Sequence, residues 1–489
     1  MTSHSPMAEA FQAVLHDRRT DVVVMAPGEG CALTPEDIDR QARELAGALA
    51  DLHLATGHLV VACLGNLSVM PALLLACLRA RLPFMPVDRS TPPAELGALA
   101  GRWEAAAVIV PDTLDLRATT DGPAPLPLCY RHARLGHGLA AWVATPCPMP
   151  GRHAPAAVLK LTSGSTGEPR ATYTEERHLI ADVAQIATAM DIGPGTRQFG
   201  VIPLSHSYGF SNLLLPLLWQ GTPLFLRPQF VPTQVGPDIT AAALETFAGV
   251  PFMFEHLARH QVLPVLPSLR LAVSAGARLT YDTVTAFHGA TGLKVRSFYG
   301  SSESGGICFD GDPRLDARVP VGPTMGRTRV ELVADPDAPE GSGRVRVSGP
   351  NVIDGYAGAA APRLDGVFLT GDYAEVDAAG TYVLTGRVPS LVNVAGRKVH
   401  PQEVEAALRA LPGVSDAVAM GVDDAVRGQA LGACLVSAEP WNARTVRQAL
   451  ATQLAAYKLP RVVVVMRALP LTDRGKVDRA AIARLLGQS

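Results

Sequence analysis

The chain has 489 residues, of which 48% are hydrophobic and 18% charged, so we expect a globular protein with more than one hydrophobic core. A formal net charge of −2 without a Lys/Arg cluster excludes nucleic acid as an expected partner. The seven cysteines have no CxxC spacing, which argues against a zinc site or a disulfide framework and fits a reducing compartment.

The N-terminal residues show no charged start followed by an apolar core, so no signal peptide is expected. The most apolar region, 213–226, is interrupted by Pro216, Gly221 and Pro223 and falls short of the ~20 apolar residues that a membrane helix needs. We therefore expect a cytoplasmic protein without a membrane segment.

The first half of the chain alternates between helix and strand signals. Thr34 as N-cap, Pro35 at the first helical position and Asp37 three residues after the cap predict a helix start. Such alternation predicts a parallel sheet with packed helices, whereas the Pro- and Gly-rich segment 123–155 is expected to run over the surface. Strands are expected over 59–64, 107–110, 157–159, 199–202, 223–226, 269–274 and 295–299, and a helix over 70–79.

A short polar loop, LTSGSTGEPRA over 161–171, follows the apolar run 157–159. Its glycines let backbone amides approach a ligand, and amides with hydroxyl donors form a concavity suited to phosphate oxygens, to which Arg170 adds charge. The GxxxxGK[ST] spacing of a Walker A loop is absent. Clusters of Ser, Thr and Gly are also typical of plain turns, so the loop alone leaves both interpretations open.

Three polar segments follow later strands, where ligands gather in α/β sheets. They are PLSHSYGF over 203–210, SAGA over 274–277 and YGSSE over 299–303. On the residues alone, a single His is more often structural, SAGA is compatible with a plain turn, and an isolated Glu is usually a solvated charge. The functional interpretation therefore depends on how the motifs combine.

The pattern becomes β-rich over 321–356, which predicts a small barrel-like subdomain. The remaining motifs are LTGDY over 369–373, LTGR over 384–387, GRKVHPQEVE over 396–405, with a helix opening at Pro401, and PLTDRGKVDR over 470–479. Only five of the 43 basic residues are lysines, namely Lys160, Lys294, Lys398, Lys458 and Lys476, so each is a candidate for a required amine.

Together, these motifs resemble in sequence and order the signatures of the adenylate-forming superfamily, which includes acyl- and aryl-CoA synthetases, luciferases and adenylation domains of peptide synthetases. The loop is similar to TSGTTGxPKG, with Arg170 at the usual Lys and Ala171 at the usual Gly. The resemblance implies an α/β fold: a large N-terminal domain (1–388) of βα-type sheets with a small β-rich subdomain, and a small mobile α+β C-terminal domain (389–489).

The resemblance also implies roles for individual residues. Lys476 would bridge the acid's carboxylate and the α-phosphate, His206 would gate the carboxylate, and Glu303 would hold Mg²⁺. Tyr299 would stack on adenine, and the Asp372 carboxylate would accept hydrogen bonds from the ribose hydroxyls. The implied ATP-binding residues are Thr162, Ser163, Gly164, Ser165, Thr166, Gly167, Arg170, Gly276, Ala277, Tyr299, Gly300, Ser302, Asp372 and Arg387, and the implied substrate pocket contains His206, Tyr208, Phe210, Ala275, Phe298, Gly305 and Gly306.

The implied reaction uses ATP and Mg²⁺ to convert a carboxylic acid into an acyl-adenylate with release of pyrophosphate. The acyl group then passes to a thiol, either CoA or the pantetheine of a carrier protein. Two alternatives remain: activation of an unusual acid such as nitrite with an amine acceptor, and a non-catalytic nucleotide-binding module. Arg170, Pro389 at the usual charged hinge position and Asn393 at a common Lys keep the first alternative open, whereas Lys476, Glu303 and Asp372 argue against the second.

Overall fold

The computed structural model describes residues 5–116, 130–163, 169–260, 266–358, 363–387, 392–394, 397–399, 401–424, 428–451, 453–454, 456–472 and 477–487. The chain divides into two compact units. The first contains Met1–Val330, Arg346–Phe368 and Asp377–Val383, and the second contains Glu331–Val345, Leu369–Val376 and Leu384–Ser489. The predicted boundary between 388 and 389 lies outside the described residues and remains a prediction.

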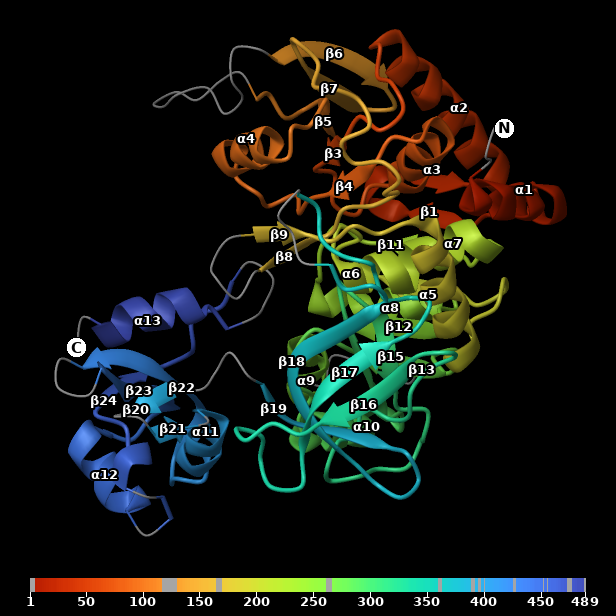
Figure 1. Cartoon of the computed structure of the whole chain (residues 1–489). Helices are drawn as coiled ribbons and strands as arrows, with labels where there is room; N and C mark the ends of the chain where they lie inside the picture. Colours follow the sequence, from red (N-terminus) through yellow and green to blue (C-terminus); the bar gives the residue numbers. More distant parts are fainter. Residues whose placement is uncertain are drawn as a thin grey trace. The chain divides into compact units, whose positions relative to one another are not determined.

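An eight-stranded sheet forms the centre of the first unit (Figure 1). Its inner strands are parallel and only the two edge pairs, β14 with β15 and β1 with β2, are antiparallel, which confirms the expected α/β class. The strand order is β15 (Gly305–Phe309), β14 (Val295–Ser301), β13 (Leu271–Ser274), β12 (Thr246–Gly249), β10 (Gln198–Gly200), β11 (Leu224–Leu226), β1 (Val24–Ala26) and β2 (Cys31–Leu33).

A second, five-stranded sheet of the first unit corrects one expectation. The segment 123–155 contributes two antiparallel strands, and the second of these is completely buried, because its apolar run Leu139–Ala144 pairs with a central strand. The segment is therefore not only a surface connection. The order is β4 (Phe84–Pro86), β3 (Val60–Ala62), β5 (Ala107–Pro111), β7 (Leu139–Ala144) and β6 (Tyr130–Gly136).

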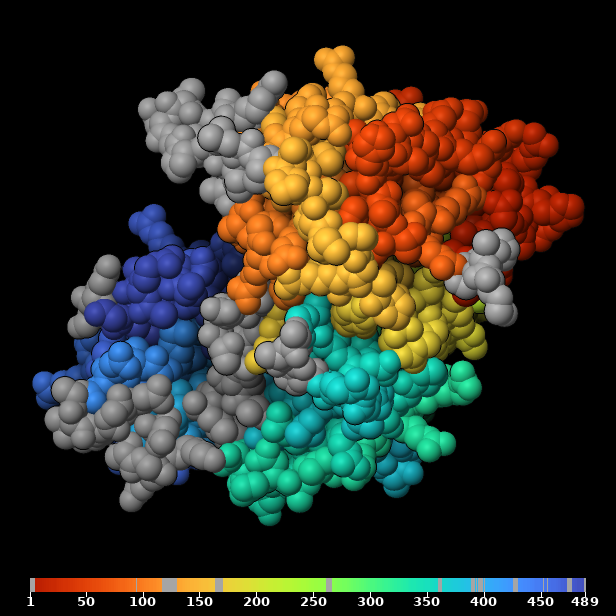
Figure 2. Space-filling model, turned by 45° about the horizontal axis from the view of Figure 1, so that its top comes forward, coloured from red at the N-terminus to blue at the C-terminus, as the bar shows by residue number. Residues whose placement is uncertain are grey.

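Helices pack against both sheets of the first unit. The helix predicted at Thr34 begins there, with the side chains of Thr34 and Asp37 forming a capping box. Figure 2 shows the early helices and the β6–β7 hairpin, coloured red to amber, as one continuous surface. The helices are α1 (Pro6–Arg18), α2 (Pro35–Asp51), α3 (Met70–Ala80), α4 (Pro93–Arg102), α5 (Glu176–Ala189), α6 (Ser207–Gly209), α7 (Leu215–Gln220), α8 (Pro232–Ala241), α9 (Pro251–Arg259) and α10 (Tyr281–Thr291), with a 3₁₀ turn η1 (Pro27–Glu29) and a π-helical turn η2 (Phe210–Leu214).

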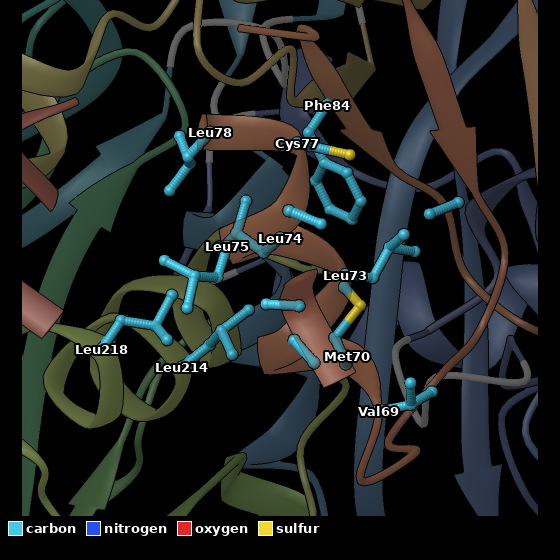
Figure 3. Close-up of a cluster of buried hydrophobic side chains, with 14 of the residues drawn as sticks. Val69, Met70, Leu73, Leu74, Leu75, Cys77, Leu78, Phe84, Leu214 and Leu218 are labelled. Carbon is cyan, nitrogen blue, oxygen red and sulfur yellow. The ribbon is translucent and has the colours of Figure 1, made fainter. Parts of the chain in front are cut away.

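The core of the first unit is centred on α3. Every residue from Met70 to Leu78 is buried, as expected for a helix that is apolar on all faces. Figure 3 shows its leucines together with Phe84 of β4 and with Leu214 and Leu218 of η2 and α7. The core thus fixes η2, which carries part of the motif 203–210, against the rest of the unit.

The phosphate-loop candidate lies on a separate two-stranded hairpin, β8 (Leu161–Ser163) and β9 (Pro169–Ala171). The strand expected over 157–159 was therefore placed too early, because only Val158 of that run forms bridges, one with Phe84 and one with Thr174. The expected barrel-like subdomain is, among the described residues, a four-stranded sheet divided between the two units. Its strands are β16 (Arg329–Val333), β17 (Gly343–Ser348), β18 (Val367–Val376) and β19 (Tyr382–Arg387).

The second unit contains a smaller α+β core, in which helices pack on a mostly antiparallel sheet. Its first helix begins at Pro401, as predicted. In the described part of the chain, no helix has the length and apolar character required to cross a membrane. The elements are β20 (Val392–Val394), β21 (Arg397–Val399), α11 (Pro401–Arg409), β22 (Val414–Asp424), β23 (Gly428–Ser437), α12 (Ala443–Leu450), η4 (Ala456–Lys458), β24 (Val462–Met466) and α13 (Arg479–Gly487).

Candidate active site

The β8–β9 hairpin places Arg170 beside the phosphate-loop candidate. Thr162 pairs with Arg170 across the two strands. The guanidinium carbon of Arg170 lies 5.6 Å from the ring centroid of Tyr356, within the range of a cation–π contact. Gly164, Ser165, Thr166 and Gly167 lie outside the described residues, and the side chain of Ser163 is not described.

Glu303 is held in the turn between β14 and β15. Its Oε1 accepts a hydrogen bond from the Tyr356 hydroxyl at 3.0 Å, and its backbone oxygen accepts one from the Ile353 amide at 3.0 Å. Burial and the neighbouring Glu303 carboxylate raise the pKa of Tyr356 well above its usual range, so this hydroxyl stays protonated as a donor. The hydrogen bond from Tyr356 thus goes to Oε1 of the Glu303 carboxylate, and not to Oε2.

The donor set at Glu303 fits Mg²⁺. This hard cation often takes one or two protein carboxylates and completes its shell with phosphate oxygens and water. Within the described residues, no group of three or more His, Cys, Asp or Glu side chains is placed to hold a metal ion.

His206 is oriented by a carboxylate that the sequence analysis missed. Its Nε2 lies 3.0 Å from Asp88 Oδ2, and this contact is the largest cause of an Asp88 pKa far below the usual range. Asp88 follows β4 by two residues, so its position after the carboxyl end of a strand was an available signal. The imidazole is about one-third exposed, whereas the carboxylate is mostly buried.

Two predicted motifs meet directly in the first unit. The hydroxyl oxygen of Ser207, at the start of α6, lies 2.6 Å from that of Ser302 in the β14–β15 turn. Ninety-odd residues of sequence separate these motifs, and the fold brings them into hydrogen-bond contact. The motif 203–210 therefore adjoins the motif that carries Glu303.

The residues proposed for the substrate pocket are closely packed. Tyr208 donates to the Val273 carbonyl at 2.9 Å, and its ring stacks on Phe298 with centroids 5.7 Å apart. A Cβ on Gly306 would come within 2.9 Å of the Phe298 ring, so this position requires glycine. Ala275 belongs to the same apolar cluster as Phe298. Phe210 is completely buried, so its side chain offers no exposed surface to a substrate.

The residues proposed to contact adenosine occupy both units. Gly276 has a φ of +81°, which favours glycine, and lies exposed with Ala277 at the end of β13. Tyr299 is mostly buried and Gly300 is exposed. In the second unit, Arg387 Nε lies 3.3 Å from Asp372 Oδ1. Lys476 lies outside the described residues.

Two buried charges near Glu303 were not assigned to the site from the sequence. Lys160, which precedes β8, is 4% exposed, and Asp182 of α5 is 2% exposed. Asp182 Oδ1 accepts a hydrogen bond from the Gly306 amide at 2.8 Å. Leu179, Asp182, Val183 and Ile186 share one face of α5, so a carboxylate within an apolar stripe was the signal that could have revealed it.

Comparison with known proteins agrees with this arrangement of motifs. The sequence profile of the AMP-binding enzyme family matches residues 11–357, and that of the AMP-binding enzyme C-terminal domain matches residues 403–476. A feruloyl-CoA synthase from Amycolatopsis sp is 28% identical over 473 residues, which cover 94% of this chain and 95% of that protein.

Solved structures show the same fold. The structure of ATP-bound MatB from Rhodopseudomonas palustris has 22% identity and a TM-score of 0.80 over 99% of both chains. The amide bond synthetase McbA from Marinactinospora thermotolerans has 24% identity and a TM-score of 0.76 over 99% of this chain and 100% of that one. Given the profile match over most of its length, the chain belongs to the AMP-binding enzyme family, as an AMP-forming acid ligase resembling the acyl-CoA synthetases.

Proposed function

We propose that this protein uses ATP to join a small carboxylic acid to the thiol of CoA through an acyl-adenylate. The observation that carries this proposal is the meeting of three motifs in the first unit. Ser207 contacts Ser302, and Tyr356 links Glu303 to Arg170 beside the phosphate-loop candidate. A carboxylate, a cation and a hydroxyl-rich loop together suit a nucleoside triphosphate.

In this proposal, the hairpin residues Thr162, Ser163 and Arg170, with Gly164 to Gly167, bind the phosphates. Glu303 binds Mg²⁺, which when bound offsets the negative charge of the phosphate oxygens. Tyr299, Gly300, Ser302, Gly276 and Ala277 receive the adenine, and Asp372 and Arg387 receive the ribose.

The acid binds near His206, whose imidazole is oriented by Asp88, and near Tyr208, Ala275, Phe298, Gly305 and Gly306. Lys476 then draws the acid's carboxylate and the α-phosphate together against their electrostatic repulsion. Positioning and charge stabilisation account for this chemistry, so no nucleophilic side chain is required. We further propose that residues 389–489 act as a mobile domain, and that a carrier-protein pantetheine is the other thiol to test.

The test is pyrophosphate exchange into ATP, screened over aliphatic, aromatic and inorganic acids. Exchange with at least one carboxylic acid, followed by thioester formation with CoA, is the expected result. Failure with every acid would overturn the proposed reaction. Exchange with nitrite alone, or transfer to an amine instead of a thiol, would replace the proposed substrate or acceptor.

A further inference from the structure

Asn66 joins the carboxyl ends of strands from the two sheets of the first unit. It follows β3 of the five-stranded sheet by four residues and is 6% exposed. Its Nδ2 donates to the Ile202 carbonyl at 3.1 Å and to the Arg227 carbonyl at 3.0 Å. Its Oδ1 accepts from the Leu204 amide at 2.8 Å. Because Ile202 lies two residues after β10 and Arg227 directly after β11, one side chain ties both parallel strands to the end of β3.

The hydrogen bonds of Asn66 require an amide. Both hydrogens of Nδ2 face backbone carbonyls, and Oδ1 faces a backbone N–H. The opposite orientation of the amide would place oxygen against two oxygens and N–H against N–H, so the contacts themselves select the orientation. An aspartate has the same size but lacks both donors, and it would leave two carbonyls without this partner. Substitution of Asn66 can therefore remove these contacts with little change in volume.

The segment that Asn66 holds leads directly to His206. Leu204, whose amide is bound to Asn66, has its side chain completely buried in the core centred on α3. The His206 amide donates to the Pro203 carbonyl at 3.1 Å, and a Cβ on Gly209 would collide with the same carbonyl oxygen. The turn that carries His206 is thus tightly closed, so a displacement at Leu204 would also move the imidazole.

The partner of His206 is fixed to the same edge of the five-stranded sheet. Oδ2 of Asp88 lies 3.0 Å from His206 Nε2, two residues after the end of β4. Its Oδ1 accepts from the amide and the hydroxyl of Ser90, and its backbone oxygen accepts from the thiol of Cys63, which directly follows β3. Since β3 and β4 are parallel neighbours, Asn66 and Asp88 have a common support.

We propose that Asn66 is a positioning residue for acid binding, which holds the segment 202–204 so that His206 meets Asp88 in one fixed orientation. The inference rests on the role of His206 near the acid in the proposed function. It requires no contact between Asn66 and the acid. The proposed ATP-binding residues of the first unit lie on the β8–β9 hairpin and after β13 and β14, whereas Asn66 contacts the ends of β10 and β11. The effect should therefore be specific to the acid.

The first test is pyrophosphate exchange by the full chain, with acetate, butyrate and benzoate as probe acids. Asn66→Asp keeps the acceptor for Leu204 but turns a carboxylate oxygen toward two carbonyls. The KM of the acid should rise roughly tenfold, while the KM of ATP stays at the parent value. In a chain that already carries His206→Ala, Asn66→Asp should raise the acid KM no further, because effects transmitted through one residue are not additive.

A second readout is independent of the acid. The imidazole signals of His206 in NMR spectra are identified by their loss in His206→Ala. Asn66→Asp and Asp88→Asn should both shift these signals, because each variant disturbs the contact between the imidazole and the carboxylate. If none of the probe acids supports exchange, the imidazole signals decide alone.

Gln220 supplies the matched control. Its Nε2 donates to the Ile192 carbonyl at 2.7 Å, and it ends α7, which precedes the amino end of β11. Gln220→Glu makes the same amide-to-carboxylate change at the opposite edge of the sheet. The acid KM and the His206 signals should remain those of the parent. If Gln220→Glu behaves like Asn66→Asp, the effect is a general loss of stability and the inference is wrong.

The remaining outcomes separate the inference from the proposed function. Parent-like His206 signals in Asn66→Asp, equal rises in the KM values of acid and ATP, or full additivity with His206→Ala would each overturn the inference alone. If Asn66→Asp does not fold, Asn66→Ala, which introduces no buried charge, decides by the same criteria. If His206→Ala leaves the acid KM unchanged, the acid role of His206 is wrong and the inference fails with it.

Discussion

The two buried lysines of the first unit have different surroundings. Lys294 Nζ lies 2.7 Å from Asp310 Oδ2 and donates to the backbone oxygens of Asp312 at 2.9 Å and Arg314 at 2.7 Å. All three ammonium protons therefore have acceptors. Lys160 has the ring of Phe210 and two carboxylates at longer range. Lys294 ties the start of β14 to the segment after β15, whereas the cation–π contact of Lys160 joins the residue before β8 to η2.

This difference bears on why each charge is retained. Burying an ion is costly, and the cost is offset best when the ion is fully hydrogen bonded. Lys294 meets this condition, so its role is explained by stability alone. Among the described residues, Lys160 contacts the Phe210 ring, and it directly precedes β8 of the proposed ATP site.

The largest expected effect is the loss of stability in Lys294→Met. Removing one partner of a buried pair leaves Asp310 uncompensated and should lower the free energy of unfolding by about 3–5 kcal/mol. Denaturant unfolding measures this, with Asp310→Asn added as the compensating change. An unchanged unfolding midpoint would show that the fully hydrogen-bonded Lys294–Asp310 pair does not stabilise the fold.

The next largest effect is expected at Lys476, which we propose to contact the acid's carboxylate and the α-phosphate. Lys476→Ala should slow acyl-adenylate formation by about 10²-fold or more, comparable to losing one transition-state electrostatic contact. Transfer from a chemically supplied acyl-adenylate to CoA should continue. Equal losses in both half-reactions would instead indicate a role in folding, and no loss in either would remove Lys476 from the site.

Much of the fold follows from local patterns in the sequence. Thr34 with Asp37 marks a helix start, and Pro401 marks another, because capping and proline preferences act within one turn. The β6–β7 hairpin was missed because turn residues surround its short apolar run, and only pairing with β5 makes it a buried strand. Local signals do not report such pairing.

The site shows the same limit. The motifs at His206 and Glu303 could be found from the sequence, whereas their direct contact through Ser207 and Ser302 arises from tertiary structure. Tyr356 was not identified because it lies 53 residues after Glu303 in an irregular segment without a motif of its own. Asp88 follows the carboxyl end of β4 and Asp182 lies in an apolar stripe of α5, so each had a local signal, but only packing shows which motif each one adjoins.

A smaller effect is expected from removing one hydroxyl next to Glu303. Tyr356→Phe removes the donor to Glu303 Oε1 and should raise the Mg²⁺ concentration for half-maximal ATP binding roughly fivefold, or about 1 kcal/mol, the usual net value of one hydrogen bond. Tyr130→Phe is the matched control, because Tyr130 donates at 3.0 Å to the Ala105 carbonyl in the five-stranded sheet. If both variants behave alike, Tyr356 does not orient Glu303.

The smallest effect is expected for Arg170→Lys, which tests whether the β8–β9 hairpin needs only a positive charge at this position or the planar guanidinium itself. Arg170 is only partly buried and contacts the face of Tyr356, so its main contribution should be a point charge toward the phosphates. Lysine keeps that charge, and pyrophosphate exchange should fall by less than about tenfold, or about 1.4 kcal/mol. Arg170→Met, which keeps the length and removes the charge, should lose more of the pyrophosphate-exchange activity.

A loss beyond about tenfold in Arg170→Lys would show that the planar guanidinium itself is needed, through a bidentate phosphate contact or through stacking on Tyr356. Equal activity in Arg170→Lys and Arg170→Met would mean that no cation at this position serves the phosphates.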